Sequence, residues 1–263
     1  MTESPKMLSH KEGRVGYLTF NNPARHNAVS LDMWQAAVDM LADFAADGDI
    51  GVVVVSGAGG KAFVSGADIS RFGSERATLK AVEHYNEVVE KSYSAFHDFP
   101  KPLIAMIRGY CIGGGLGLAV SCDLRICSEG SRFAVPAAKL GLGYDYPGLK
   151  RLVDVVGPSF AKEIFFTARQ FSASEAKDMG LVNRVVADGE LETYVKDYAA
   201  TISGNAPLTV NSVKFIINEV LKDESGRDPK KSEALVAQCF ASNDYIEGRN
   251  AFLEKRKPVF TGT

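Results

Sequence analysis

The sequence predicts an α/β core followed by a helical C-terminal region. Strand-like and helix-like apolar patterns alternate as far as residue 188, and only helical patterns follow in residues 189–263. Hydrophobic residues make up 46% of the 263 residues, which is enough for a sizeable core. We therefore expect a core over residues 1–188. A helical layer without strands often packs against a neighbouring subunit, so residues 189–263 are expected to serve oligomerisation.

The first part of the core reads as strand, loop, helix and strand. Residues 15–20 alternate as in a half-buried strand and lead into the turn-rich loop NNPARHNAVS. Ser30 is suited to N-cap a helix whose apolar face recurs at helical spacing, and residues 52–55 then predict a buried strand. A polar helix is expected up to Pro100, and residues 102–107 predict the next strand.

The second part of the core consists of shorter elements. Residues 124–127 and 133–135 predict extended segments, and a helix is expected over residues 158–168 with a proline at its start. Ser172 and Glu175 have the spacing of a capping box, which predicts a short helix ending at Gly180, and residues 181–186 predict the last strand. Four amphipathic helices are then expected, over residues 190–203, 207–222, 231–241 and 245–257.

The charge and cysteine content exclude several classes of protein. A net charge of -2 gives no overall field for nucleic acid or an anionic membrane surface. The four cysteines have neither zinc-site spacing nor the density of a disulfide framework, and the four histidines show no metal-ligand spacing. With no signal-peptide pattern and no apolar run of membrane-spanning length, the sequence predicts a cytoplasmic protein that binds no metal and enters no membrane.

Two glycine-rich corners are the most informative motifs. In IAMIRGYCIGGGLGLAVSCD (residues 104–123), Gly113–Gly115 interrupt an apolar run just before a segment expected to be helical, and we expect unpaired amides and the positive helix end to face outward there. In FVSGAD (residues 63–68), a further amide donor is expected near Ala67. Two converging donors would polarise a carbonyl. The alternative for such glycine clusters is a tight turn or close helix packing. The fingerprints of dinucleotide-binding turns, phosphate loops and nucleophile elbows are each incomplete in this sequence.

Asp145 is the candidate carboxylate in a glycine-flanked loop, FAVPAAKLGLGYDYPGLKRL (residues 133–152), where it lies between Tyr144 and Tyr146. Partial removal of water there would suit a carboxylate to general acid or base chemistry. The alternative is a turn aspartate that bonds its own backbone. His84 also has acid–base capacity, but a lone histidine on a polar helix is more often a surface residue.

Taken together, these segments resemble the crotonase superfamily, the enoyl-CoA hydratase and isomerase group, over essentially the whole chain. Five motifs fit the family pattern in order: NNPARHNAVS, FVSGADIS, RGYCIGGGLGLAVSCDLRIC, FSASEAKDMGLVNRVV and FLEKRKPVF. The resemblance implies a spiral of ββα units with a C-terminal helical region that forms trimers, often paired into hexamers. It also implies an acyl-CoA substrate, with coenzyme A entering only as part of that substrate and no tightly bound cofactor.

The resemblance also implies roles for individual residues. The amides of Ala67 and Gly114 would hold the thioester carbonyl and stabilise an enolate. Arg25 in the first motif and Lys255 in the last would contact phosphates of coenzyme A, and Lys255 would do so in a neighbouring subunit. The alternative for both side chains is a solvated surface charge.

Two departures from the family pattern bear on the chemistry. Typical family hydratases carry glutamates where this chain has Gly117 and Ala137, neither of which can move a proton. By the same comparison, Asp145 takes the place of the aspartate of dienoyl-CoA isomerases and of the nucleophile of aryl-CoA dehalogenases. The dehalogenases also use a histidine and a tryptophan, whose positions hold Glu90 and Ala137, and the dienoyl-CoA isomerases use a glutamate at the latter position.

The sequence thus favours an enoyl-CoA or dienoyl-CoA double-bond isomerase that moves a proton with Asp145, assisted by Glu90 or Tyr144. A single base suffices for isomerisation, whereas hydration must also activate a water. The alternatives are a hydratase with a non-standard acid–base set, an acyl-CoA or aryl-CoA hydrolase acting through covalent Asp145, and a non-catalytic binding protein on the same scaffold. No nucleic-acid partner is expected, since no arginine-rich run is present.

Overall fold

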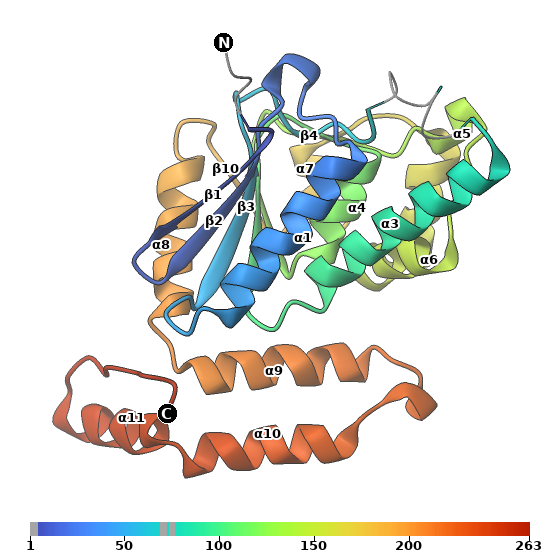
Figure 1. The fold of residues 1–263 in the computed structure, drawn as a ribbon. Helices are drawn as coiled ribbons and strands as arrows, with labels where there is room; N and C mark the ends of the chain where they lie inside the picture. Colours follow the sequence, from blue (N-terminus) through green and yellow to red (C-terminus); the bar gives the residue numbers. More distant parts are fainter. Residues whose placement is uncertain (1–4, 69–72, 74–76) are drawn as a thin grey trace.

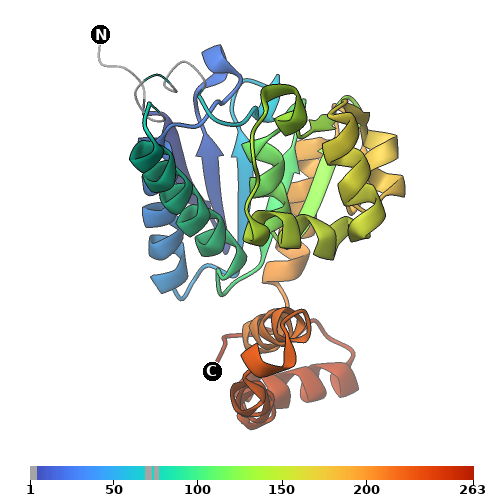
Figure 2. The same ribbon diagram turned by 90° about the vertical axis from the view of Figure 1, so that its right-hand side faces the viewer.

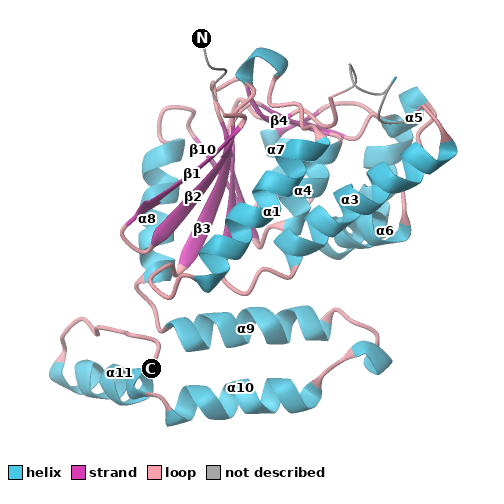
Figure 3. Ribbon diagram, viewed as in Figure 1, coloured by secondary structure: helices cyan, strands magenta, loops and turns pink. Residues whose placement is uncertain are grey.

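The computed structural model describes residues 5–68, 73 and 77–263, so the last two residues of the FVSGADIS motif lie outside the described residues. The strands form two sheets, shown in magenta in Figure 3. The larger sheet has six strands, and only its first pair is antiparallel. Its order is β1 (Met7–Glu12), β2 (Val15–Phe20), β3 (Val52–Gly57), β5 (Leu103–Ile107), β7 (Leu124–Ser128) and β10 (Arg184–Val186).

The smaller sheet gives the fold its spiral. It contains β4 (Ala62–Val64), β6 (Tyr110–Ile112), β8 (Arg132–Ala134) and β9 (Phe171–Ser172), in that order. Along the chain, each successive strand pair gives one strand to each sheet and then leads into a helix. The units are β3 and β4 before α3 (Leu79–His97), β5 and β6 before α4 (Gly114–Ser121), and β7 and β8 before α5 (Ala137–Leu140). This is the expected spiral of ββα units.

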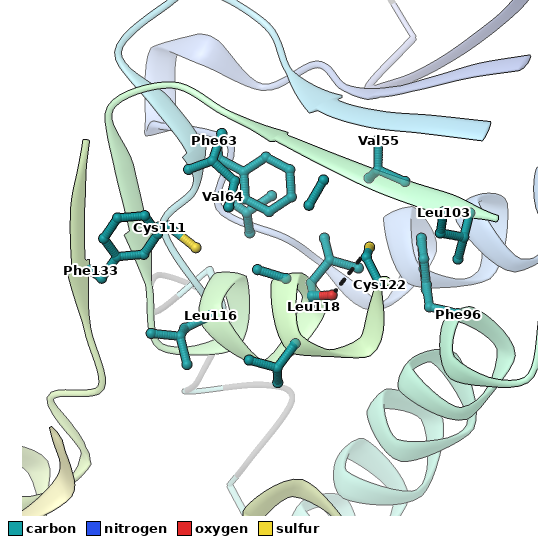
Figure 4. Close-up of a cluster of buried hydrophobic side chains, with 14 of the residues drawn as sticks. Val55, Phe63, Val64, Phe96, Leu103, Cys111, Leu116, Leu118, Cys122 and Phe133 are labelled. Carbon is teal, nitrogen blue, oxygen red and sulfur yellow. Dashed lines mark hydrogen bonds between the residues drawn. The ribbon is translucent and has the colours of Figure 1, made fainter. Parts of the chain in front are cut away.

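Both faces of the larger sheet are covered by helices (Figure 1). One face packs against α1 (Leu31–Ala46), α3, α4 and α6 (Tyr146–Thr167), and the other packs against α8 (Leu191–Ser203). Burial on both faces explains why β3 and β5 are almost uninterrupted runs of Val, Ile, Leu and Ala. Figure 4 shows the core around α4, where Leu116 and Leu118 lie among side chains from both sheets and from α3.

Helix α6 differs from the prediction because it begins at Tyr146 rather than at residue 158. Gly157 interrupts it with a φ of 74°, and Pro158 begins its second segment, so the predicted start marks a kink inside a longer helix. Asp145 is consequently the N-cap residue of α6 rather than a residue of an open loop. Helix α7 (Ala173–Asp178) has the predicted capping box between Ser172 and Glu175.

The C-terminal helices α9 (Pro207–Val220), α10 (Pro229–Ala241) and α11 (Asn243–Glu254) form a layer set apart from the core (Figures 1 and 2). Among the contacts that tie it to the core, Lys214 Nζ donates to Asp123 Oδ2 at 2.8 Å and Arg14 donates to the Phe260 carbonyl at 3.0 Å. Helix α10 buries no residue, and Phe240 and Phe252 are 64% and 83% exposed. Helix α8 packs on the larger sheet although it follows residue 188. The division of the chain into a core over residues 1–188 and an oligomerisation region over residues 189–263 stays a prediction.

Candidate active site

The two glycine-rich corners border one pocket of about 210 Å³. Helix α3, the start of α4, the start of α5 and the segment that leads into α6 enclose it. The lining is mainly apolar and aromatic, with few ionisable side chains. It includes Trp34, Ala67, Tyr85, Glu90, Tyr93, Gly114, Gly117, Ala137, Leu140, Leu142, Tyr144, Asp145 and Arg151.

Each of the three consecutive glycines meets a different requirement at the start of α4. Gly113 has a φ of 55°, which reverses the chain between β6 and the helix, and its amide donates to the Ala134 carbonyl at 2.8 Å. Gly115 faces strand β4, where an added Cβ would lie 1.9 Å from the Val64 carbonyl oxygen. Gly114 is the first helical residue and faces the pocket. Close packing, the alternative stated for this motif, explains Gly115, whereas Gly114 faces the pocket and is also close to Tyr93, whose hydroxyl oxygen would lie 3.0 Å from an added Cβ.

The second corner is held by a short parallel bridge between Val29 and Ala67. The Val29 amide donates to the Gly66 carbonyl at 2.8 Å, and the Asp68 amide donates to the Val29 carbonyl at 3.1 Å. Gly66 has a φ of 102°, a conformation that favours glycine. Neither hydrogen bond of the bridge uses the Ala67 amide, so this amide can donate to a molecule bound in the pocket.

The two corners lie against each other. A Cβ built on Gly66 would lie 3.4 Å from the Gly114 nitrogen, and one built on Gly114 would lie 3.5 Å from the Gly66 Cα. Within the described part of the chain, neither the Ala67 amide nor the Gly114 amide donates a hydrogen bond to a protein acceptor. Two neighbouring unpaired amides, one of them at the positive end of a helix, form a suitable binding site for an oxygen that develops negative charge.

Asp145 and Tyr144 line the pocket from the segment that leads into α6. Asp145 is exposed, so the removal of water expected from its sequence context is not seen in the single chain. Its carboxylate makes no cap hydrogen bond to α6 and has no ion-pair partner among the described residues, which sets aside the turn-aspartate alternative. Tyr144 is 40% exposed, and its ring packs edge-on against Phe165 at 4.8 Å.

Glu90 faces the pocket from α3, but its carboxylate is engaged by Arg151 of α6. The guanidinium donates to Oε1 at 3.0 Å and to Oε2 at 2.5 Å, and the Ser94 hydroxyl donates to Oε1 at 3.2 Å. The Arg151 side chain is only 10% exposed. A bidentate pair of this kind fixes the position of both side chains.

Tyr93 is a pocket residue to which the sequence reasoning gave no role. Its hydroxyl donates to the Gly114 carbonyl at 3.0 Å, and its ring contacts Trp34 edge-on at 5.2 Å. Burial raises the pKa of the Tyr93 hydroxyl well above its usual value, so the group stays protonated. The signal was present in the sequence, because Tyr93 lies three residues after Glu90 and so on the same face of a helix.

The two candidates for binding coenzyme A lie outside this pocket. Arg25 is exposed beside the second corner and pairs with Asp68 at 3.2 Å. Its loop is anchored by buried Asn27, whose side-chain amide donates to the Ala62 carbonyl at 2.8 Å. Lys255 is exposed at the end of α11 and does not line the pocket.

The structure describes no group of three or more metal-ligating side chains within residues 5–68, 73 and 77–263. Over the same residues, every helix is too short or too polar to cross a membrane.

Known proteins with similar sequences share the expected family. The sequence model of the enoyl-CoA hydratase/isomerase family matches residues 10–263. A short-chain-enoyl-CoA hydratase from Clostridium acetobutylicum is 34% identical over 97% of both chains. A peroxisomal Delta(3,5)-Delta(2,4)-dienoyl-CoA isomerase from Arabidopsis thaliana is 34% identical over 95% of this chain and 93% of its own.

Solved structures with a similar fold come from the same family. An enoyl-CoA hydratase/carnithine racemase from Magnetospirillum magneticum superposes with a TM-score of 0.92 at 37% identity, covering 99% of this chain and 97% of that one. An enoyl-CoA hydratase from Bacillus anthracis gives a TM-score of 0.89 at 29% identity, over 98% of this chain and 100% of that one. With sequence, fold and motif order in agreement over nearly its whole length, the chain belongs to the enoyl-CoA hydratase/isomerase family.

Proposed function

We propose that this chain isomerises a double bond of an enoyl-CoA or dienoyl-CoA thioester. The amides of Ala67 and Gly114 bind the thioester oxygen, and the resulting enolate is stabilised by dipoles that are already in place. Asp145 removes a proton from one carbon and returns it to another. Coenzyme A takes part only as the substrate's carrier group, with Arg25 and the Lys255 side chain of a neighbouring subunit as its phosphate contacts.

One observation carries this choice of reaction. Among the described residues that line the pocket, only Glu90 and Asp145 are acidic, and Glu90 is held on both oxygens by Arg151. Gly117 and Ala137, which replace the two glutamates of typical hydratases, also line the pocket. A pocket with one free carboxylate suits proton removal and return by a single group.

The position of Asp145 is compatible with this role. Asp145 lines the pocket and is exposed, so a bound acyl chain would cover it and displace water from it. The Tyr144 hydroxyl on the same segment is a further hydrogen-bond donor for the intermediate.

A hydratase is the second candidate. Of the four relatives described above, three are named as hydratases and one as an isomerase, and Glu90 supplies a second carboxylate in the pocket. Hydration would then use Glu90 and Asp145 together, with Glu90 held in place by Arg151.

Turnover assays with enoyl-CoA, dienoyl-CoA and aryl-CoA substrates separate these reactions. For the isomerase, Asp145→Asn should lower kcat by about 10²- to 10⁴-fold, the usual contribution of a general acid–base group. Asp43→Asn, an exposed aspartate of α1 outside the pocket, is the matched control and should have no effect. Isomerisation at the wild-type rate in Asp145→Asn would remove Asp145 from the mechanism.

The other products identify the alternatives. Water addition that is lost in Glu90→Gln would indicate the hydratase, and release of free coenzyme A that requires Asp145 would indicate the hydrolase. A wild-type protein that binds acyl-CoA but converts none of these substrates would be a binding protein.

A further inference from the structure

Tyr93 is held over the first turn of α4 from several directions. Its ring packs edge-on against Trp34, with an interplanar angle of 76°, and the Arg151 guanidinium lies 5.7 Å from the ring centroid. Its hydroxyl donates to the Gly114 carbonyl at 3.0 Å. Because Arg151 is itself fixed by Glu90, the Tyr93 ring has little freedom to move aside.

The ring fills the space above Gly117. A Cβ built on Gly117 would lie 3.0 Å from both Cζ and the hydroxyl oxygen of Tyr93, and a Cβ built on Gly114 would lie 3.0 Å from the same oxygen. Ordinary contacts of a Cβ begin at 3.4 Å. A side chain at position 117 therefore meets Tyr93 and can extend into the pocket only if the ring moves aside.

We propose that Tyr93 determines which reaction this pocket supports, by occupying the volume from which a carboxylate at position 117 would act. Gly117 and Tyr93 are complementary, because the Tyr93 ring occupies the space that a side chain at position 117 would need. The hydroxyl also anchors Gly114 through its carbonyl, which lies in the peptide next to the one that carries the Gly114 amide, the candidate donor to the substrate oxygen. This inference rests on the proposed function, since it explains why the pocket works with a single free carboxylate.

The packing is tested first, without substrate, by a double-mutant cycle in urea unfolding. With Tyr93 present, Gly117→Ala should lower the unfolding midpoint because its methyl group meets the ring. In the Tyr93→Ala background, the same change should raise the midpoint, because alanine is the better helix former. Equal shifts in the two backgrounds would overturn the proposal. This cycle stays informative even if the chain does not act on acyl-CoA.

The effect on the reaction is tested by placing Gly117→Glu in three backgrounds and measuring hydration of crotonyl-CoA. With wild-type Tyr93 and with Tyr93→Phe, which keeps the ring, no hydration should appear. With Tyr93→Ala, hydration should be at least about tenfold faster than in either. Equal hydration in all three backgrounds would overturn the proposal, as would no gain in a folded Tyr93→Ala variant that binds acyl-CoA.

The hydroxyl is tested separately in the otherwise unchanged chain. Tyr93→Phe should lower kcat for isomerisation with little change in KM, because it removes the anchor on the Gly114 carbonyl and so loosens the residue whose amide binds the developing charge. A change confined to KM would contradict a positioning role for the hydroxyl.

Discussion

Replacing Ala67 by proline removes one candidate donor to the substrate oxygen and little else. Proline has no amide hydrogen, and the two hydrogen bonds of the bridge use the amides of Val29 and Asp68 instead. Ala67 is not among the residues with a positive φ, so its backbone does not exclude proline on that ground. Since no protein hydrogen bond is lost, we expect the free energy of unfolding to change by less than about 1 kcal/mol.

The kinetic effect should be much larger. Loss of one preorganised donor typically costs about 2.7–4 kcal/mol of transition-state stabilisation, or about 10²- to 10³-fold in kcat. We expect a loss of this size for Ala67→Pro in steady-state turnover of the preferred acyl-CoA, with a smaller change in KM. Ala67→Ser keeps the amide and is the matched control. A folded Ala67→Pro variant whose kcat stays within about threefold of wild type would refute the reasoning.

Three further predictions concern stability and assembly. Gly115→Ala should destabilise the fold by about 1–3 kcal/mol or more in urea unfolding, since its Cβ would lie 1.9 Å from the Val64 carbonyl oxygen, whereas Gly143→Ala has open space and should be tolerated. The hydrogen bond from the Ser172 backbone amide, and then that from the Arg169 guanidinium, lower the pKa of Glu175 to about 2. Its contribution to the free energy of unfolding is therefore complete above its unfolded pKa and is lost as the pH falls from about 5 to about 2. Glu175→Gln should flatten the fall in stability over this pH range, and an unchanged fall would contradict the assignment. Sedimentation should show a trimer or hexamer that Phe252→Glu dissociates, and a monomeric wild type would contradict the expected assembly.

The parts of the fold that were predictable are those with strong local patterns. The β-branched run of β3 and the helical spacing of α1 and α8–α11 specify their elements directly, since burial of one or both faces dictates the residue types. Strands β4, β6 and β9 escaped prediction because two or three residues carry no periodicity. The second sheet therefore became visible only in the structure.

The start of α6 was missed for a specific reason. Gly157 and Pro158 look like a helix boundary, and the chain does leave the helical conformation at Gly157, yet a helical segment lies on either side. The sequence Asp-Tyr-Pro at residues 145–147 was the usable signal, because an N-cap residue followed by proline often begins a helix.

The site was predictable where backbone groups form it and less so where side chains pair across helices. The glycine corners indicated Ala67 and Gly114 because glycine permits the turns that expose amides. The engagement of Glu90 by Arg151 depends on the packing of α3 against α6, which no local pattern reports. The same holds for the placement of Tyr93 over Gly117.

The central claim is that two peptide amides polarise a thioester carbonyl, and the bound carbonyl itself reports on this most directly. An acyl-CoA labelled with ¹³C at the thioester carbon should show a downfield carbonyl resonance when bound to the wild-type chain, because hydrogen bonds draw electron density from the carbon. The shift should shrink in Ala67→Pro. A bound resonance at the position of the free thioester would contradict the account.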